Sequence, residues 1–358
     1  MIAHDYLTQR GGAERVVLAM LTAFPDARIV TSIYDAEATY QEFRNCDVQT
    51  SWLSKVSAFR RDPRRALALL APTWSATHID DADVVICSST GWAHGVRTQA
   101  TKIVYCHNPA RWLYQADEYL SGAGPVTRAG MKVLRPSLRA WDQRAARSAT
   151  TYLANSTVVA DRIATTYDVE AEIVHPPSAI STGPVEPIPG IEPGFLLTVG
   201  RSRGYKNTGA VAHAVRDLPG ERLVAVGGVP HGDWPARIRG LNDISDSQLR
   251  WLYRNADALV ACAYEDFGLT PIEAYSVGTP AVVLRAGGYL DTSVPGVTGE
   301  FVATAEPADI ASGIRRFRQS SYSTSAIETH GKSFSVDEFA AKLRNVVLKS
   351  YLAGPLIA

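Results

Sequence analysis

Short apolar runs, each followed by a polar or glycine-bearing turn and then by an amphipathic segment, recur along the chain. Residues 84–87 and 102–106 are such runs. They are too short for a buried helix and contain branched side chains, which is typical of buried strands, and residues 2–6 are also expected to form a strand. Residues 13–24 carry apolar side chains at helical spacing. This alternation of strand and helix predicts an α/β protein with parallel sheets.

The same alternation returns in the second half of the chain, after a break. Between Pro176 and Pro193 there are six prolines and no regular period, which predicts an interdomain linker. Beyond it, strands are predicted at residues 195–200, 223–228, 258–261 and 281–284. We therefore predict a first domain at residues 1–178, a linker at 179–194, a second domain at 195–334 and a C-terminal helix at 335–358.

Charge and cysteine content narrow the class of protein. The 358 residues include 36 lysines and arginines and 36 acidic residues, so a formal net charge of zero gives no sign of nucleic-acid binding. The four cysteines are widely spaced, which favours reduced thiols in the cytoplasm and argues against a zinc site. The chain enters its first strand without a signal-like segment, and no apolar run approaches the ~20 residues of a membrane span. We expect a cytoplasmic protein.

Two carboxylates flank a predicted short helix in the second half. Glu265 follows the strand 258–261, and a helix is expected to begin with Thr270 as its N-cap, with Glu273 as the capping-box partner and Gly278 at its end. The loop amides of Phe267, Gly268, Leu269 and Thr270 would then point out of the carboxyl edge of the sheet, beside both glutamates. This layout predicts a site for an anionic or hydroxyl-rich ligand. Glu273 has an alternative role as a capping residue only.

A second pattern places positive charge ahead of a helix. Arg201, Arg203 and Lys206 precede a helix that Asn207 is expected to cap. Cations at a helix N-terminus oppose the helix dipole, and a bound anion would reverse that unfavourable interaction. We interpret the segment as a diphosphate site; the alternative is a solvated basic loop. In the first half, Gly11 and Gly12 follow a strand and would let a ligand approach the backbone.

The segment from Glu265 to Glu273, with seven residues between the two glutamates, followed by Gly278-Thr-Pro and Gly287-Gly288, resembles the signature of retaining GT-B glycosyltransferases of family 4. The best-matching block covers about residues 245–300. The resemblance implies an α/β, GT-B fold of two Rossmann-like doubly wound domains that face each other across a cleft, with the last helix crossing back to the first domain. It also implies that Glu265 lies against the donor sugar and Glu273 against the nucleotide ribose.

Three further segments resemble the same family. Arg201 and Lys206, in Gly-Arg-x(4)-Lys, correspond to its diphosphate clamp, and Ile244 to a backbone contact with the nucleotide base. His107, in Tyr-Cys-His-x-Pro-x-Arg, is similar to a residue that contacts the donor sugar in a subgroup acting on mannose-like and deoxysugar donors. The segment of residues 4–15 resembles the amino end of the family, with fewer apolar residues ahead of it, so we expect an upstream start codon.

The resemblance implies an enzyme, a retaining hexosyltransferase that uses a nucleoside-diphosphate sugar and acts on a hydroxyl of a glycan, glycolipid or small-molecule acceptor. His107, Glu265, Arg201 and Lys206 would serve catalysis, without a metal or cofactor. Mannose-like donors on guanosine are favoured, with uridine and thymidine open. A GT-B epimerase or phosphorylase, and a non-catalytic sugar-nucleotide-binding scaffold, are the alternatives. The Asp81-Ala82-Asp83 sequence precedes a strand, away from the ligand edge, and is interpreted as a solvated turn.

Two basic segments combine cations with apolar side chains. Residues 55–65 are one, and Arg128, Lys132, Arg135 and Arg139 recur at helical spacing in the other, where Pro136 is expected to break the helix. Such surfaces bind anionic lipid, at roughly 1 kcal/mol per well-placed cation. Solvated helix faces look the same in sequence, so peripheral membrane contact and ordinary solvation both stay open.

Overall fold

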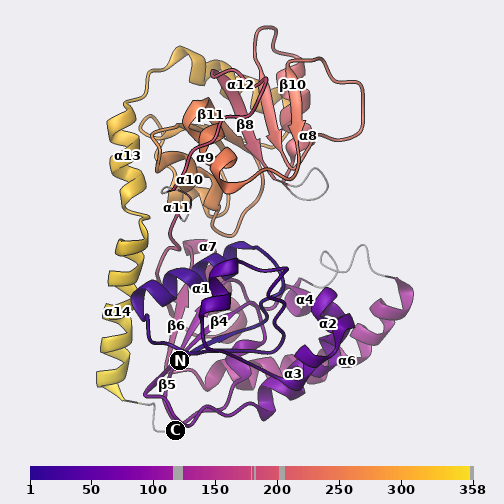
Figure 1. The fold of residues 1–358 in the computed structure, drawn as a ribbon, viewed down its shortest axis with the longest axis vertical. Helices are drawn as coiled ribbons and strands as arrows, with labels where there is room; N and C mark the ends of the chain where they lie inside the picture. The colour runs from indigo at the N-terminus through magenta and orange to yellow at the C-terminus, as the bar shows by residue number, and fades with distance from the viewer. Residues whose placement is uncertain (116–123, 179, 181–182, 201–205, 355–358) are drawn as a thin grey trace. The chain divides into compact units, whose positions relative to one another are not determined.

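The computed structural model describes residues 1–115, 124–178, 180, 183–200 and 206–354, with the side chains of 125–129 left out. The chain forms two compact units, the first of residues 1–175 and 339–358 and the second of residues 176–338. Each unit is built on one sheet of parallel strands (Figure 1). The prediction of two Rossmann-like α/β domains is confirmed.

The first unit has a seven-stranded sheet in the order β3-β2-β1-β4-β5-β6-β7. From β1 the chain moves outward in one direction through β2 and β3, and then returns to β4 and moves in the other direction. Because crossovers between parallel strands are right-handed, helices of the two directions cover opposite faces. The strands are β1 (Ile2–His4), β2 (Ile29–Thr31), β3 (Val48–Thr50), β4 (Val84–Ser89), β5 (Thr101–Cys106), β6 (Thr151–Ala154) and β7 (Ala171–Ile173).

Helices and short 3₁₀ segments connect these strands. The sequence pattern placed a helix at residues 13–24, and the structure has it one residue earlier. The α-helices are α1 (Gly12–Ala23), α2 (Ser57–Arg61), α3 (Leu67–Ala76), α4 (Arg111–Tyr114), α6 (Pro125–Arg147), α7 (Thr157–Tyr167) and α14 (Val336–Ala353), and the 3₁₀ segments are Gln41–Asn45, Trp52–Lys55, Pro63–Ala66 and η4 (Ala93–Gly95). From Phe339 onward, α14 belongs to the first unit, where the Phe339 ring lies 5.9 Å from that of Tyr105.

The second unit has a six-stranded sheet in the order β10-β9-β8-β11-β12-β13. Its strands are β8 (Phe195–Val199), β9 (Leu223–Val226), β10 (Ile238–Leu241), β11 (Ala256–Ala261), β12 (Ala281–Leu284) and β13 (Gly299–Val302). Its helices are α8 (Thr208–Arg216), α9 (Asp246–Asn255), α10 (Leu269–Tyr275), α11 (Tyr289–Thr292), α12 (Pro307–Gln319) and α13 (Thr324–Lys332).

The proline-rich segment is packed against the second unit. Ile180 and Ile191 are buried in the core of that unit, and Arg250 Nε donates to the carbonyl oxygen of Pro184 at 2.7 Å. Apolar residues between the prolines therefore anchor a stretch whose composition suggested a linker.

Pro136 does not break its helix, contrary to the prediction. α6 runs through it from Pro125 to Arg147. Pro136 is exposed, and the helix is held on either side of it by the buried residues Met131 and Leu138. Water can take up the carbonyl that a proline leaves unpaired on an exposed face, so the buried side chains outweigh the lost backbone bond.

The predicted cap of α10 is also wrong. The helix begins at Leu269 after Gly268, which adopts a left-handed φ of 89°, and no side chain caps it. Thr270 and Glu273 thus lie inside the helix. A glycine turn that only a residue without Cβ adopts readily decided the start, rather than the Thr-x-x-Glu spacing. The expected left-handed residue beyond the helix end is present, since Gly278 has φ 78°.

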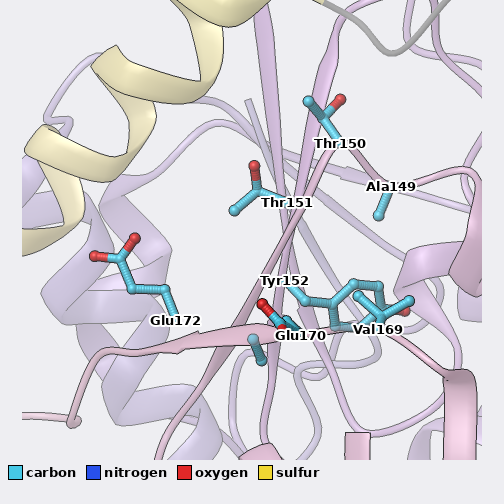
Figure 2. A pocket seen from close by; sticks show the side chains of 8 residues that line it. Ala149, Thr150, Thr151, Tyr152, Val169, Glu170 and Glu172 are labelled. Atoms are coloured by element: carbon cyan, nitrogen blue, oxygen red, sulfur yellow. The ribbon is translucent and has the colours of Figure 1, made fainter. Parts of the chain in front are cut away.

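A hollow of about 390 Å³ lies beside β6 and the edge strand β7 of the first sheet (Figure 2). It is lined by residues 149–152 and 169–172, which include the first residues of β6 and β7. It therefore opens at the amino edge of the sheet, opposite the carboxyl edge at which ligands collect in open α/β folds. Among the helices of the described part of the chain, none has the length and apolar composition needed to cross a membrane.

Candidate functional site

In each sheet there is one place where the chain reverses its direction of travel, and ligands of such sheets bind at the carboxyl ends of the two strands on either side of it. In the second unit these strands are β8 and β11, which are direct neighbours. Lys206 and Glu265 lie after these two strands, in the loops that follow Val199 and Ala261, whereas Glu273 lies on α10 and Ile244 follows β10.

An ion pair joins these two loops. Lys206 Nζ contacts Glu265 Oε1, and the Glu265 side chain is only 11% exposed. The Asn207 side chain donates to the carbonyl oxygen of Cys262 at 2.9 Å, so it ties the loops together instead of capping α8 as predicted. The structure therefore brings Lys206 and Glu265 together, as a shared site requires. Arg201 and Arg203 lie outside the described residues.

Glu273 is the second buried carboxylate of this region. Its side chain points away from solvent, with 8% of the residue exposed, and Oε2 accepts a hydrogen bond of 2.7 Å from the Tyr253 hydroxyl on α9. This hydrogen bond from Tyr253 fixes the orientation of the Glu273 carboxylate. The second predicted role of Glu273, a reciprocal cap of α10, is excluded by the position of the helix start.

Glycines let the backbone of this site pack closely. A Cβ on Gly287 would lie 2.3 Å from the carbonyl oxygen of Glu265, and a Cβ on Gly288 would lie 2.3 Å from the Cα of Phe267. The amide of Gly288 donates to the same Glu265 carbonyl at 2.9 Å. Phe267 is buried, while Leu269 and Thr270 are partly exposed at the start of α10. Ile244 is partly buried ahead of α9, against the core of the unit.

In the first unit the reversal lies between β1 and β4, where histidine and serine side chains lie at the strand ends. His4 and Ser88 are paired in register on these strands, and both are buried. His4 Nδ1 lies 3.0 Å from Ser88 Oγ and 3.2 Å from the Ser88 carbonyl oxygen. Ser88 Oγ in turn lies 2.8 Å from Nε2 of His107, the residue that follows β5. Three side chains on three adjacent strands thus form one hydrogen-bonded row.

His107 is firmly held and uncharged. Its amide donates to the Ser89 carbonyl oxygen at 2.9 Å, and its own carbonyl accepts from Asn155 Nδ2 at 3.0 Å. Desolvation, with a smaller contribution from the nearby His4, lowers the pKa of His107 from 6.5 to about 3. The imidazole is therefore neutral at physiological pH.

Asp5 organises the loop that follows β4. Its buried carboxylate accepts hydrogen bonds from the amide of Thr90 at 2.7 Å and from the amide of Ala93 at 2.6 Å. The loop then continues into η4, where the imidazole of His94 lies 3.0 Å from the fully buried Asp142 of α6. Asp142 also accepts from the Tyr114 hydroxyl at 2.6 Å, so one carboxylate ties the loops after β4 and β5 to α6.

Gly11 and Gly12 come at the start of α1, with Gly11 as the N-cap residue. A Cβ on Gly11 would lie 2.5 Å from Glu14 Oε2, which is buried and has no hydrogen-bond partner among the described residues. Desolvation raises the pKa of Glu14. The glycine turn therefore makes room for a buried carboxyl group beside the strand end.

Sequence reasoning assigned no individual role to Ser88, Glu14, Asp142 or Tyr253. Their roles arise from contacts between segments that are distant in sequence, as between His4 and Ser88, 84 residues apart. One signal was available: the reversal of strand order predicts that the residues ending β1 and β4 lie side by side.

Comparison with known proteins bears on the same region. Residues 188–333 match the family model for glycosyl transferases group 1. The matched segment contains Lys206, Glu265 and Glu273, together with the described part of the loops around them.

Curated relatives of the chain are glycosyltransferases. It is 30% identical over 184 residues to D-inositol 3-phosphate glycosyltransferase 2 of Catenulispora acidiphila, an alignment that covers 43% of each protein. It is 29% identical over 119 residues to alpha-1,3/1,6-mannosyltransferase ALG2 of Dictyostelium discoideum, which covers 32% of this chain and 28% of the relative. The alignments thus span less than half the length of these curated relatives.

Solved structures share the fold over nearly the whole chain. Sucrose-phosphate synthase from Thermosynechococcus elongatus has a TM-score of 0.69 at 17% identity, covering 99% of this chain and all of that protein. Anabaena HepE in complex with UDP-glucose has a TM-score of 0.68 at 15% identity, covering 97% of this chain and 99% of the other. At these identities the likeness establishes the GT-B fold.

Proposed function

We propose that the chain is a retaining glycosyltransferase that moves a hexose or deoxyhexose, with mannose-like sugars favoured, from a nucleoside diphosphate to a hydroxyl of a glycan, glycolipid or small molecule. The observation that carries the proposal is the Lys206–Glu265 ion pair beside the buried Glu273, at the reversal point of a group 1 glycosyltransferase domain. The relatives named for inositol phosphate and mannose transfer support a sugar-transfer reaction.

The ion pair has the properties that a diphosphate site needs. Without ligand, Glu265 balances the charge of Lys206 in a partly desolvated loop. An incoming diphosphate supplies a second anionic partner, and Lys206, with Arg201, would neutralise the charge that grows on the leaving group. Glu265 is then available to accept hydrogen bonds from sugar hydroxyls, while Glu273 is placed to accept them from the ribose.

Charge neutralisation by side chains supports a metal-independent reaction with no cofactor. We do not assign any side-chain carboxylate the role of a covalent nucleophile. We therefore infer that the sugar is transferred on one face, with retention at the anomeric carbon. In this reaction the leaving diphosphate helps to take the proton of the acceptor hydroxyl. His107 would orient the sugar.

We propose, further, that the protein works in the cytoplasm at the membrane surface. On α6, Val133 is 79% exposed and Leu134 37% exposed, beside the exposed cations Lys132 and Arg139. Exposed apolar side chains flanked by cations suit an anionic lipid surface. An acceptor on a lipid carrier would be presented at such a surface.

The test is release of nucleoside diphosphate from a panel of GDP-, UDP- and dTDP-sugars, with and without glycan and polyprenyl-linked acceptors, followed by product analysis. Transfer or hydrolysis of one donor with an α-linked product from an α-linked donor supports the proposal. An epimerised sugar nucleotide would support an epimerase instead, and tight binding without any turnover would support a scaffold.

A further inference from the structure

The hydrogen-bonded row of His4, Ser88 and His107 has only one consistent arrangement of protons. Each imidazole nitrogen either donates or accepts, and a serine hydroxyl has one proton to donate. The row contains one group whose role is fixed, the carbonyl oxygen of Ser88, which can only accept. It lies 3.2 Å from His4 Nδ1, so this nitrogen carries a proton.

The remaining protons follow in order. His4 Nδ1–H points at the Ser88 carbonyl and at Ser88 Oγ, 3.0 Å away, which therefore accepts. The Ser88 hydroxyl proton is then directed along the other contact, 2.8 Å to His107 Nε2. His107 Nε2 accepts it, and the proton of the neutral His107 ring stands on Nδ1.

The reverse arrangement is unfavourable. If His107 Nε2 donated to Ser88, the hydroxyl would donate to His4 Nδ1, and the lone pair of that nitrogen would face the lone pairs of the Ser88 carbonyl. Both His4 and Ser88 are at most 2% exposed, so water does not relieve such a clash. A buried unmatched pair of acceptors costs roughly 1–3 kcal/mol.

We propose that His4 and Ser88 lock His107 in its Nδ1–H tautomer, which makes His107 a fixed hydrogen-bond donor to a ligand oxygen and excludes it as a proton acceptor. Among the described residues, His107 Nδ1 has no hydrogen-bond partner, and His107 is a partly exposed residue just beyond the carboxyl end of β5. The outer nitrogen thus presents a proton to any ligand bound there. Ser88 and His4 are positioning residues.

The tautomer bears on the reaction. Nε2 is occupied by the Ser88 hydroxyl, and Nδ1 already carries a proton, so neither nitrogen can take one from an acceptor hydroxyl. His107 can hold an oxygen of the donor in place, and the acceptor proton must leave by another route. This consequence rests on the proposed function, whereas the tautomer itself does not.

The decisive experiment is nitrogen-15 NMR of the ligand-free protein labelled at its eight histidines, with long-range proton correlation at pH 7. The signals of His107 are assigned by their loss in His107→Gln. We expect a protonated Nδ1 and an unprotonated Nε2. Protonation on Nε2, or rapid exchange between the two tautomers, would overturn the inference, and neither outcome depends on turnover with any sugar.

A pair of serine variants tests the part played by Ser88. In Ser88→Ala the His107 signals should move away from the pure Nδ1–H pattern. The kcat/KM for the donor should fall about tenfold, which corresponds to about 1.4 kcal/mol. Ser350→Ala is the matched control, because Ser350 is also buried and pairs with a hydroxyl, that of Thr151, at 2.8 Å near the amino edge. It should leave both readouts unchanged. An unaltered His107 tautomer in a folded Ser88→Ala protein would contradict the role of Ser88.

Discussion

The reversal points of the two sheets share one topology and differ in charge. Between β8 and β11 of the second unit, an ammonium and a carboxylate face each other, with a second buried carboxylate nearby. Between β1 and β4 of the first unit, the corresponding strand ends carry a hydrogen-bonded row of histidine, serine and histidine, and the neighbouring Asp5 carboxylate accepts from backbone amides. The ammonium group of Lys206 can compensate a charge that changes during a reaction, whereas the neutral imidazole of His107 can only orient a partner. This difference agrees with the roles proposed for Lys206 at the leaving group and for His107 at the sugar.

The largest effect is expected at the charged site. Lys206→Ala removes the cation proposed to meet the diphosphate and should lower kcat by about 10²- to 10³-fold, a magnitude typical of losing one preorganised electrostatic group. Folding should persist, since Lys206 is partly exposed. Initial rates of diphosphate release with saturating donor provide the measurement. The exposed Lys332 of the same unit serves as control, and Lys332→Ala should retain the full rate. Equal rates in Lys206→Ala and Lys332→Ala would show that Lys206 does not take part in the reaction.

A smaller effect is expected at Glu273. Glu273→Ala removes the carboxylate proposed for the ribose and should raise the KM of the donor by about 10- to 100-fold, the range of one hydrogen bond to a charged group. Tyr253→Phe keeps the carboxylate but removes the 2.7 Å bond that orients it, and should raise KM less. Steady-state kinetics with varied donor distinguishes the two. If Tyr253→Phe were the more damaging, Glu273 would matter for packing rather than for binding.

The neutral imidazole of His107 should affect how the stability of the protein depends on pH. The folded pKa of His107 is about 3, below its ordinary 6.5, so between these values the unfolded chain binds a proton that the folded chain does not. The free energy of unfolding should therefore fall as the pH falls below 6.5, and His107 should account for up to about 1.4 kcal/mol of this loss per pH unit. Above pH 6.5 the titration of His107 should not affect the stability.

Urea unfolding at pH 7, 6 and 5 measures how the free energy of unfolding changes with pH in the wild type and in His107→Gln, which lacks the titrating group. The free energy of unfolding of the variant should fall less between pH 7 and pH 5. His78→Gln, at an exposed histidine of the same unit, should keep the sensitivity of the wild type. Equal slopes in wild type and His107→Gln would show that His107 is not held neutral.

The smallest expected effect concerns α6. Lys132→Glu with Arg139→Glu reverses two exposed charges and should weaken co-sedimentation with vesicles containing phosphatidylglycerol, at roughly 1 kcal/mol per cation. Lys342→Glu with Lys349→Glu reverses two exposed charges on α14 and serves as control. If both pairs lowered binding equally, the attraction would be a property of overall charge and not of the α6 surface.

Local patterns predicted most of the fold. The bounds of β12 are those of the apolar run that predicted a strand at residues 281–284. The failures arose where distant contacts outweighed local preference: Met131 and Leu138 keep α6 continuous across Pro136, and the close approach of Gly268 to the Tyr289 ring accompanies a helix start that no capping side chain marks. For the site, the motif located Glu265 and Lys206, while Ser88 became visible only through the strand register.

The most direct test of the proposed site is calorimetric titration of GDP, UDP and dTDP into the wild-type protein and into Lys206→Ala at one fixed salt concentration. The wild type should bind one of the three nucleotides preferentially, and Lys206→Ala should bind that nucleotide at least tenfold more weakly, because the diphosphate loses its cationic partner. Equal affinity in the two proteins, or no binding of any nucleoside diphosphate to the wild type, would contradict a diphosphate site between β8 and β11.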